Sequence, residues 1–163
     1  MKNTFLALGL VLLFLGCQNN VGKQLPDFKE TTAQQITLSK DQLKGKVTVI
    51  NVWATWCGTC VAEIGALNQL AEKYKDNPKV KLIAVSDESK EVVEAFLQKR
   101  PFHWEHIYSS SELADMLQTR LVRTYPQTLV IDQDLNVVFD QSGGTAGIGE
   151  TLDQLIQGML QKP

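Results

Sequence analysis

Apolar runs and amphipathic stretches alternate along this sequence from about residue 25 to the C-terminus. Residues 47–52 form an apolar run with β-branched side chains, which is typical of a strand buried on both faces of a parallel sheet. Residues 80–86 have the same character. Between them, apolar residues recur at helical spacing after Cys57, and this predicts a helix that ends near Asn77-Pro78. Its predicted inner face consists of Ile64, Leu67, Leu70, Ala71 and Tyr74.

The second half of the chain continues the alternation. Helices are predicted after Ser89, after Ser109 and from Ile148. Their predicted inner faces are Val92, Val93, Phe96 and Leu97; Leu113, Met116 and Leu117; and Ile148, Leu152, Leu155, Ile156 and Met159. Short strands are predicted at 35–38 and 104–108, and a hairpin at 128–131 and 137–139. The order of these elements indicates an α/β domain with a mixed sheet.

The N-terminus has the pattern of a targeting segment. Lys2 precedes an apolar run, Phe5 to Leu15, which has the length of a signal-peptide core and is too short for an ordinary membrane span. The run ends in Phe14-Leu15-Gly16-Cys17, which resembles the bacterial lipobox, where the cysteine is acylated and becomes the new N-terminus. We therefore expect a lipoprotein signal peptide at 1–16, a lipidated polar tether at 17–24 and a domain at 25–163. A simple secretory signal or an uncleaved anchor is the alternative.

Length, charge and cysteine content limit the number of domains, the kinds of partner and the possible disulfides. The 163 residues suit one domain, and the net charge of −2, without a basic stripe, gives no indication of nucleic-acid binding. The chain has three cysteines. If Cys17 carries lipid, only Cys57 and Cys60 remain, and no further pair is available for a structural disulfide.

Cys57 and Cys60 lie at the predicted start of a helix. The free main-chain N–H groups and the helix dipole favour negative charge there, which lowers the pKa of the first thiol. Because the thiolate is the species that attacks a disulfide, Cys57 is the predicted nucleophile and Cys60 the cysteine that displaces the mixed disulfide. Half a zinc site is the alternative, but His103 and His106 are the only histidines and have no zinc-ligand spacing. No metal or cofactor is expected.

The segment Trp53–Cys60 (WATWCGTC), Glu63 and the segment Tyr125–Asp132 (YPQTLVID) together resemble thioredoxin-like proteins. They most resemble the membrane-anchored TlpA-like branch, which includes the thiol oxidoreductases of cytochrome c maturation. The resemblance covers the chain from about residue 25. It implies a thioredoxin-like fold, with a central mixed sheet flanked by helices, an N-terminal extension and an inserted helix region.

The resemblance also assigns roles to individual residues. It implies that Pro126 is cis and lies against the two cysteines, which lets the main chain of Tyr125 pair with an extended substrate. Trp56 resembles the family tryptophan that covers one side of the dithiol, and we expect it to contact substrate. Thr59 stands where thioredoxin itself has proline, and Gly65 where many TlpA-like relatives have proline. Both differences bear on the redox potential.

Glu63 is the most specific of these hypotheses. Thioredoxins place a buried aspartate six residues before the nucleophile, but this chain has Asn51 there, and an amide cannot exchange a proton near neutral pH. Glu63 matches the TlpA-like glutamate three residues after the second cysteine. Helical spacing directs it between Leu67 and Leu70 on the apolar face, where burial without a cation raises a carboxyl pKa. We expect Glu63 to accept the proton of Cys60.

These observations predict a thiol–disulfide oxidoreductase that reduces protein disulfides outside the cytoplasm, anchored in the bacterial cell envelope. Its expected partners are protein substrates, with apocytochrome c as the family-level candidate, and a membrane electron donor. We expect a monomer. One rival is a peroxiredoxin-like peroxidase, suggested by the opening Pro26-Asp27-Phe28. The other is an anchored binding or chaperone module whose dithiol is vestigial.

Overall fold

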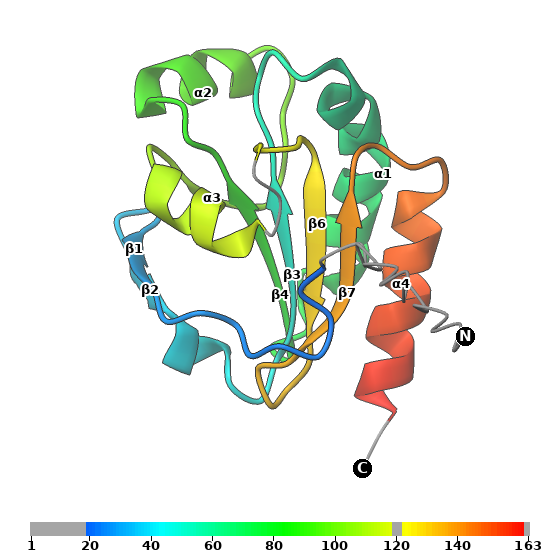
Figure 1. Ribbon diagram of the computed structural model, residues 1–163. Helices are drawn as coiled ribbons and strands as arrows, with labels where there is room; N and C mark the ends of the chain where they lie inside the picture. The colour runs from blue at the N-terminus through cyan, green and yellow to red at the C-terminus, as the bar shows by residue number, and fades with distance from the viewer. Residues whose placement is uncertain (1–18, 119–121, 162–163) are drawn as a thin grey trace, which may run out of the picture.

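The computed structural model describes residues 19–118 and 122–161, and its centre is a five-stranded sheet of order β5-β4-β3-β6-β7 (Figure 1). The strands are β3 (Val47–Val52), β4 (Val80–Val85), β5 (Glu105–Ile107), β6 (Gln127–Ile131) and β7 (Val137–Ser142). β3, β4 and β5 run parallel, whereas β6 and β7 are antiparallel to their neighbours. The expected mixed sheet is therefore confirmed.

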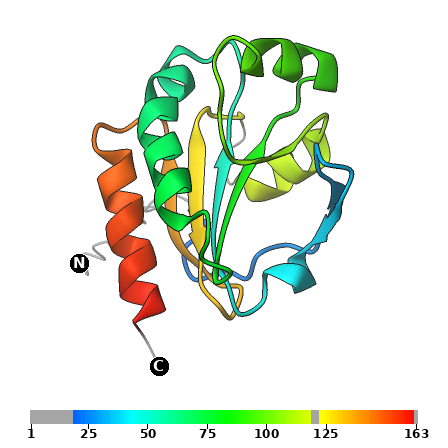
Figure 2. The ribbon, with the colours of Figure 1, turned by 180° about the vertical axis from the view of Figure 1, so that it is seen from behind.

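Helices cover both faces of this sheet. α1 (Gly58–Tyr74) and α4 (Ile148–Leu160) lie side by side on one face, and α3 (Ser111–Leu117) lies on the other (Figures 1 and 2). α2 (Lys90–Leu97) contributes Val93 to the same core as α1 and α4. Alternate residues of the central strand serve the two cores: Val49 packs with α1, and Ile50 packs with α3. The strand that precedes the cysteines is thus held from both sides.

An N-terminal extension precedes the sheet. Its strands β1 (Lys29–Thr31) and β2 (Thr37–Ser39) pair antiparallel and lead into a short 3-10 helix, η1 (Lys40–Leu43). β1 was not predicted, and β2 begins two residues later than the predicted strand because Gln35 has a φ of 61° and lies in the connecting turn. Leu25, Phe28, Leu38 and Leu43 join the core on the α3 face.

Two residues predicted to face the core do not. Val92 is 47% exposed and Met116 is 38% exposed. Each is followed by a residue that is at most 1% exposed, Val93 and Leu117. Successive residues of a helix point about 100° apart. Because Val93 and Leu117 point into the core, Val92 and Met116 point away from it. α1 also ends three residues earlier than Asn77, with Lys75 as its C-cap.

The end of the expected tether belongs to the folded domain. Gly22 donates its main-chain N–H to the carbonyl of Val137 at 2.8 Å, and Val137 donates in turn to the carbonyl of Lys23. Asn20 is only 9% exposed. The chain is therefore fixed to the β6–β7 hairpin from Asn20 onwards rather than from residue 25.

Cys17 and the predicted signal segment at 1–16 lie outside the described residues. Among the residues that are described, none of the helices has the length and apolar character needed to cross a membrane.

Candidate active site

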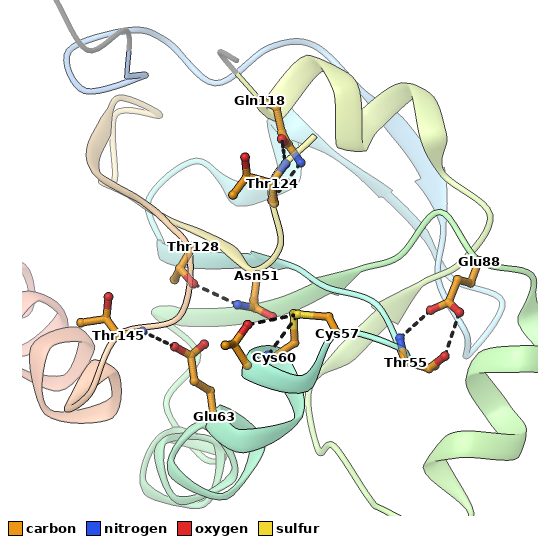
Figure 3. The surroundings of a disulfide bond; sticks show 11 residues. Asn51, Thr55, Cys57, Cys60, Glu63, Glu88, Gln118, Thr124, Thr128 and Thr145 are labelled. Carbon is orange, nitrogen blue, oxygen red and sulfur yellow. Dashed lines mark hydrogen bonds between the residues drawn. A yellow bond between two sulfur atoms is a disulfide. The ribbon is translucent and has the colours of Figure 1, made fainter. Parts of the chain in front are cut away.

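Cys57 and Cys60 lie where the central strand passes into the longest helix. β3 ends at Val52, a short loop follows, and Cys57 is the N-cap of α1. The two sulfurs form a disulfide with an S–S distance of 2.06 Å and a Cα–Cα distance of 5.3 Å (Figure 3). The structure therefore shows the pair in its oxidised form.

The surroundings of Cys57 favour negative charge on its sulfur. The main-chain N–H of Cys60 donates to Cys57 Sγ at 3.1 Å, and Thr59 Oγ1 lies 3.4 Å from the same sulfur. These contacts use the position of Cys57 before the first turn of α1, where main-chain N–H groups have no intrahelical acceptor. On reduction the same groups would stabilise a thiolate at Cys57.

A loop with a cis peptide bond lies beside the disulfide. The Tyr125–Pro126 bond is cis, as expected. Tyr125 and Cys57 line one surface hollow, together with Trp56, Gly58, Thr59, Arg123 and Thr124. Trp56 is 68% exposed and meets the Tyr125 ring edge-on, with the ring centroids 5.2 Å apart. The structure thus brings Trp56, Cys57 and Tyr125 to one open surface. Trp53, by contrast, is a fully buried core residue.

Side chains from α3 and its C-terminal end hold this loop. The Gln118 amide accepts the main-chain N–H of Thr124 at 2.7 Å and donates to its carbonyl at 3.3 Å (Figure 3). Arg123 donates to Asp115 at 2.7 Å and also pairs with Asp87. Among the described residues, neither main-chain polar group of Tyr125 has a hydrogen-bond partner. Within residues 19–118 and 122–161, the groups that the resemblance assigns to substrate pairing thus make no hydrogen bond.

Glu63 is buried on α1, as predicted, and is 8% exposed. Its Oε1 accepts the main-chain N–H of Thr145 at 2.7 Å, whereas Oε2 has no hydrogen-bond partner (Figure 3). Burial raises the pKa of Glu63 above its ordinary value, and the Thr145 bond lowers it by a smaller amount. Asn51 is also buried and donates to Thr128 Oγ1 at 2.9 Å. Burial thus makes the carboxylate of Glu63 a stronger base than that of an exposed glutamate.

Glu88 is a site residue that the sequence analysis missed. Its carboxylate accepts the main-chain N–H of Thr55 at 2.6 Å and the Thr55 hydroxyl at 2.7 Å. It therefore holds the loop between β3 and Cys57 (Figure 3). Because β3 and β4 are parallel, the segments after their carboxyl ends lie at one edge of the sheet. Glu88 comes three residues after the end of β4. Its position beside Thr55 could therefore have been predicted from the parallel pairing of the two strands.

The two histidines lie away from any metal-binding arrangement. His103 is exposed, and His106 is 3% exposed with its ring centroid 5.8 Å from that of Trp53. Burial lowers the pKa of His106, and its ring packs among the aromatic rings of Trp53, Phe102 and Tyr108. Within 19–118 and 122–161, no group of three or more histidine, cysteine or acidic side chains could hold a metal ion.

The fold and the site together define a thioredoxin-fold protein with a redox-active cysteine pair. The family model described as the AhpC/TSA family matches residues 21–139. A thiol-disulfide oxidoreductase ResA from Bacillus cereus is 30% identical over 148 residues, covering 87% of this chain and 78% of the relative. The thioredoxin-like protein YneN of Bacillus subtilis is 33% identical over 127 residues, covering 76% of this chain and 72% of that protein.

Solved structures agree with the fold. A putative thiol:disulfide interchange protein DsbE from Chlorobium tepidum has a TM-score of 0.76 at 23% identity, covering 88% of this chain and 99% of its own. A putative protein disulfide isomerase from Bacteroides thetaiotaomicron has a TM-score of 0.78 at 23% identity, covering 88% and 92% of the two chains. The chain belongs to the AhpC/TSA family, in its thioredoxin-like thiol–disulfide oxidoreductase branch.

Proposed function

We propose that this thiol–disulfide oxidoreductase works as a reductant of protein disulfides, with Cys57 as the attacking thiolate. The observation that carries the proposal is the position of Cys57. It is the N-cap of α1, its sulfur accepts an N–H group, and it lines the hollow formed with Trp56 and Tyr125. Cys60 lies within the first turn and does not line that hollow. Because the sulfur of Cys57 is stabilised as a thiolate and borders the hollow, Cys57 attacks first.

The reaction proceeds in two exchange steps. Cys57 thiolate attacks one sulfur of the substrate disulfide, so a Cys57–substrate bond forms and the other substrate sulfur leaves as a thiolate. Cys60, as a thiolate, then attacks Cys57 Sγ, which forms the Cys57–Cys60 bond and releases the second substrate thiolate. Two electrons pass from the enzyme to the substrate. Glu63 accepts the proton of Cys60 before the second step.

The substrate binds along the proline loop, which we define as residues 122–127. An extended segment pairs with the main-chain groups of Tyr125 next to Pro126, in the manner of an added strand. Trp56 covers the other side of the sulfurs and presents an apolar face to the same segment. Because recognition of this kind uses main-chain groups, it suits unfolded protein substrates, and we propose apocytochrome c as the substrate. A membrane electron donor re-reduces the enzyme, which acts as a monomer.

We propose that Cys17 carries lipid and holds the domain at the outer side of a membrane of the cell envelope. The support is the apolar run that ends in Phe14-Leu15-Gly16-Cys17. Because Asn20, three residues beyond Cys17, is bonded to Asp140 and Leu117 of the domain, the domain would lie close to the membrane surface. Mass spectrometry of the mature N-terminus tests this. Acylated Cys17 is expected, and an unmodified N-terminus beyond Cys17 would reject the anchor.

Trapping of mixed disulfides tests the assignment of the cysteines. Cys60→Ser removes the resolving thiol, so the variant should accumulate Cys57-linked mixed disulfides with oxidised insulin or with envelope proteins. Cys57→Ser, the matched control, should accumulate none. The reverse pattern would overturn the order of attack. Peroxide consumption that survives in Cys60→Ser would instead support the peroxidase rival, and biological function that survives in Cys57→Ala would support the binding module.

A further inference from the structure

Two acceptors next to the proline loop are each shared by the same pair of residues. The Asp140 carboxylate accepts the main-chain N–H of Asn20 at Oδ2, at 2.7 Å, and Gln127 Nε2 at Oδ1, at 2.8 Å. The carbonyl of Leu117 accepts Asn20 Nδ2 at 2.7 Å and Gln127 Nε2 at 3.2 Å. The N-terminal segment and the residue after the cis bond therefore depend on the same two groups.

The main chain of Gln127 is paired within the sheet as the first residue of β6, whereas its side chain depends on these two bonds among the described residues. Gln127 follows Pro126, is 1% exposed, and its Oε1 has no hydrogen-bond partner. The two bonds from Nε2 are thus the only polar contacts that fix this side chain among the described residues. A change in the position of Asp140 or of the Leu117 carbonyl would remove one of these two bonds, and the loss of both would leave the buried amide of Gln127 without partners, which is unfavourable.

Asn20 fixes both acceptors from the opposite side. Leu117 is the last residue of α3, and a carbonyl at a helix C-terminus has no intrahelical donor. The Asn20 side chain supplies one donor, and its main-chain N–H occupies the other oxygen of Asp140. Because Asn20 is 9% exposed, water does not readily replace these bonds.

We propose that Asn20 is a positioning residue for the proline loop and acts through Leu117, Asp140 and Gln127. The proposal deepens the proposed function, because it explains how the substrate-pairing main chain of Tyr125 is held ready. The apparent affinity for substrate is proportional to the fraction of molecules whose loop is in the binding-competent arrangement. It therefore falls when that fraction falls. The reduction potential of the dithiol should stay the same, since Asn20 has no contact with either sulfur.

The chain contains a matched control. Gln24 belongs to the same N-terminal segment and also ties it down, but to the turn between β6 and β7, through Asn136 Oδ1 at 2.6 Å and the carbonyl of Asp134 at 3.2 Å. Asn20→Ala removes the donor to Leu117, and Asn20→Asp keeps the shape but places an acceptor against that carbonyl. Gln24→Ala removes bonds of the same kind without touching Gln127.

Steady-state reduction of oxidised insulin is measured first. Asn20→Ala and Asn20→Asp should raise the KM roughly three- to tenfold, with kcat and the Cys57–Cys60 reduction potential unchanged. Gln24→Ala should leave KM unchanged. In a Gln127→Ala background, Asn20→Ala should raise the KM little further, because both substitutions act through the same two acceptors, Leu117 and Asp140. An unchanged KM in both Asn20 variants, or an equal rise in Gln24→Ala, would overturn the proposal.

Amide hydrogen exchange gives a readout that needs no activity. Exchange within the proline loop should be faster in Asn20→Ala than in the wild type and unchanged in Gln24→Ala, whereas exchange in β3 should not differ. Equal exchange in all three proteins would overturn the role of Asn20. An inactive wild type would instead count against the proposed function, and the exchange experiment would still decide the present inference.

Discussion

The main-chain N–H of Thr145 donates a 2.7 Å hydrogen bond to Oε1 of Glu63, across 82 residues of sequence. The loop between β7 and α4 thus closes over the helix that carries Cys60. Among the described residues, Glu63 Oε2 has no hydrogen-bond partner, and burial raises the pKa of the carboxyl by more than the Thr145 bond lowers it. Proton uptake at Oε2 is therefore favoured, since a neutral carboxyl is less costly to bury than a carboxylate, and this suits Glu63 to accept a proton from Cys60.

Glu63→Gln should change how stability depends on pH. Because the folded pKa of Glu63 lies above its ordinary value of 4.5, the native state holds more protons than the unfolded state above that pH. Wild-type stability therefore falls as the pH rises from about 4.5 through the raised folded pKa. Glutamine does not titrate, so the urea midpoint of the variant should rise relative to that of the wild type as the pH increases above about 4.5. Glu72→Gln, on the exposed part of α1, should show no such gain.

Glu63→Gln should also slow the second exchange step. If Glu63 takes the proton of Cys60, release of a Cys57-linked mixed disulfide should be slower in the variant and should lose its titration near the pKa of Glu63. The loss expected for a proton-transfer residue is about 10²-fold or more. Stopped-flow release measured against pH checks this. The same rate and pH profile in both proteins would show that Glu63 has only a structural role.

Gly144→Ala should destabilise the turn that carries the cysteines. A Cβ atom at Gly144 would lie 2.8 Å from Cβ of Thr59 and 3.5 Å from Glu63 Oε1, so the loop or the first turn of α1 must shift. The expected loss is about 1–3 kcal/mol in the free energy of unfolding. Gly158→Ala is the control, because the added methyl group meets no atom within 4 Å inside α4. It should stabilise the protein by about 0.5–1 kcal/mol.

Glu88→Ala should loosen the loop before Cys57. The change leaves the Thr55 N–H and hydroxyl without their acceptor, at a cost of about 1–3 kcal/mol in the free energy of unfolding. Glu94→Ala, which loses only a 3.8 Å ion pair with Lys90, should cost less than about 1 kcal/mol. Chemical denaturation of both variants tests the comparison. Equal losses would mean that Glu88 does not hold this loop in solution.

The sequence allowed the centre of the fold to be predicted because its signals there are local. An apolar strand, a cysteine pair and an amphipathic helix follow one another, so Cys57 could be placed at a helix start without tertiary information. The cis bond before Pro126 required the family resemblance, since most such bonds are trans.

Other features depend on partners far away in the sequence. Asn20 resembles an ordinary tether residue until Leu117 and Asp140 surround it, and they are 97 and 120 residues away. Glu88 acquires its role only when β4 lies beside β3. Val92 was assigned to the core because helical periodicity alone does not determine which of two adjacent apolar residues points inward.

The reduction potential of the Cys57–Cys60 pair tests the central claim most directly. The oxidised protein is equilibrated in glutathione buffers of graded potential, and the thiols are counted at each step. A reductant of protein disulfides should show one reversible two-electron transition at a potential below about −200 mV. A potential near about −120 mV, typical of strong dithiol oxidants, or cysteines that do not interconvert in these buffers, would contradict the account.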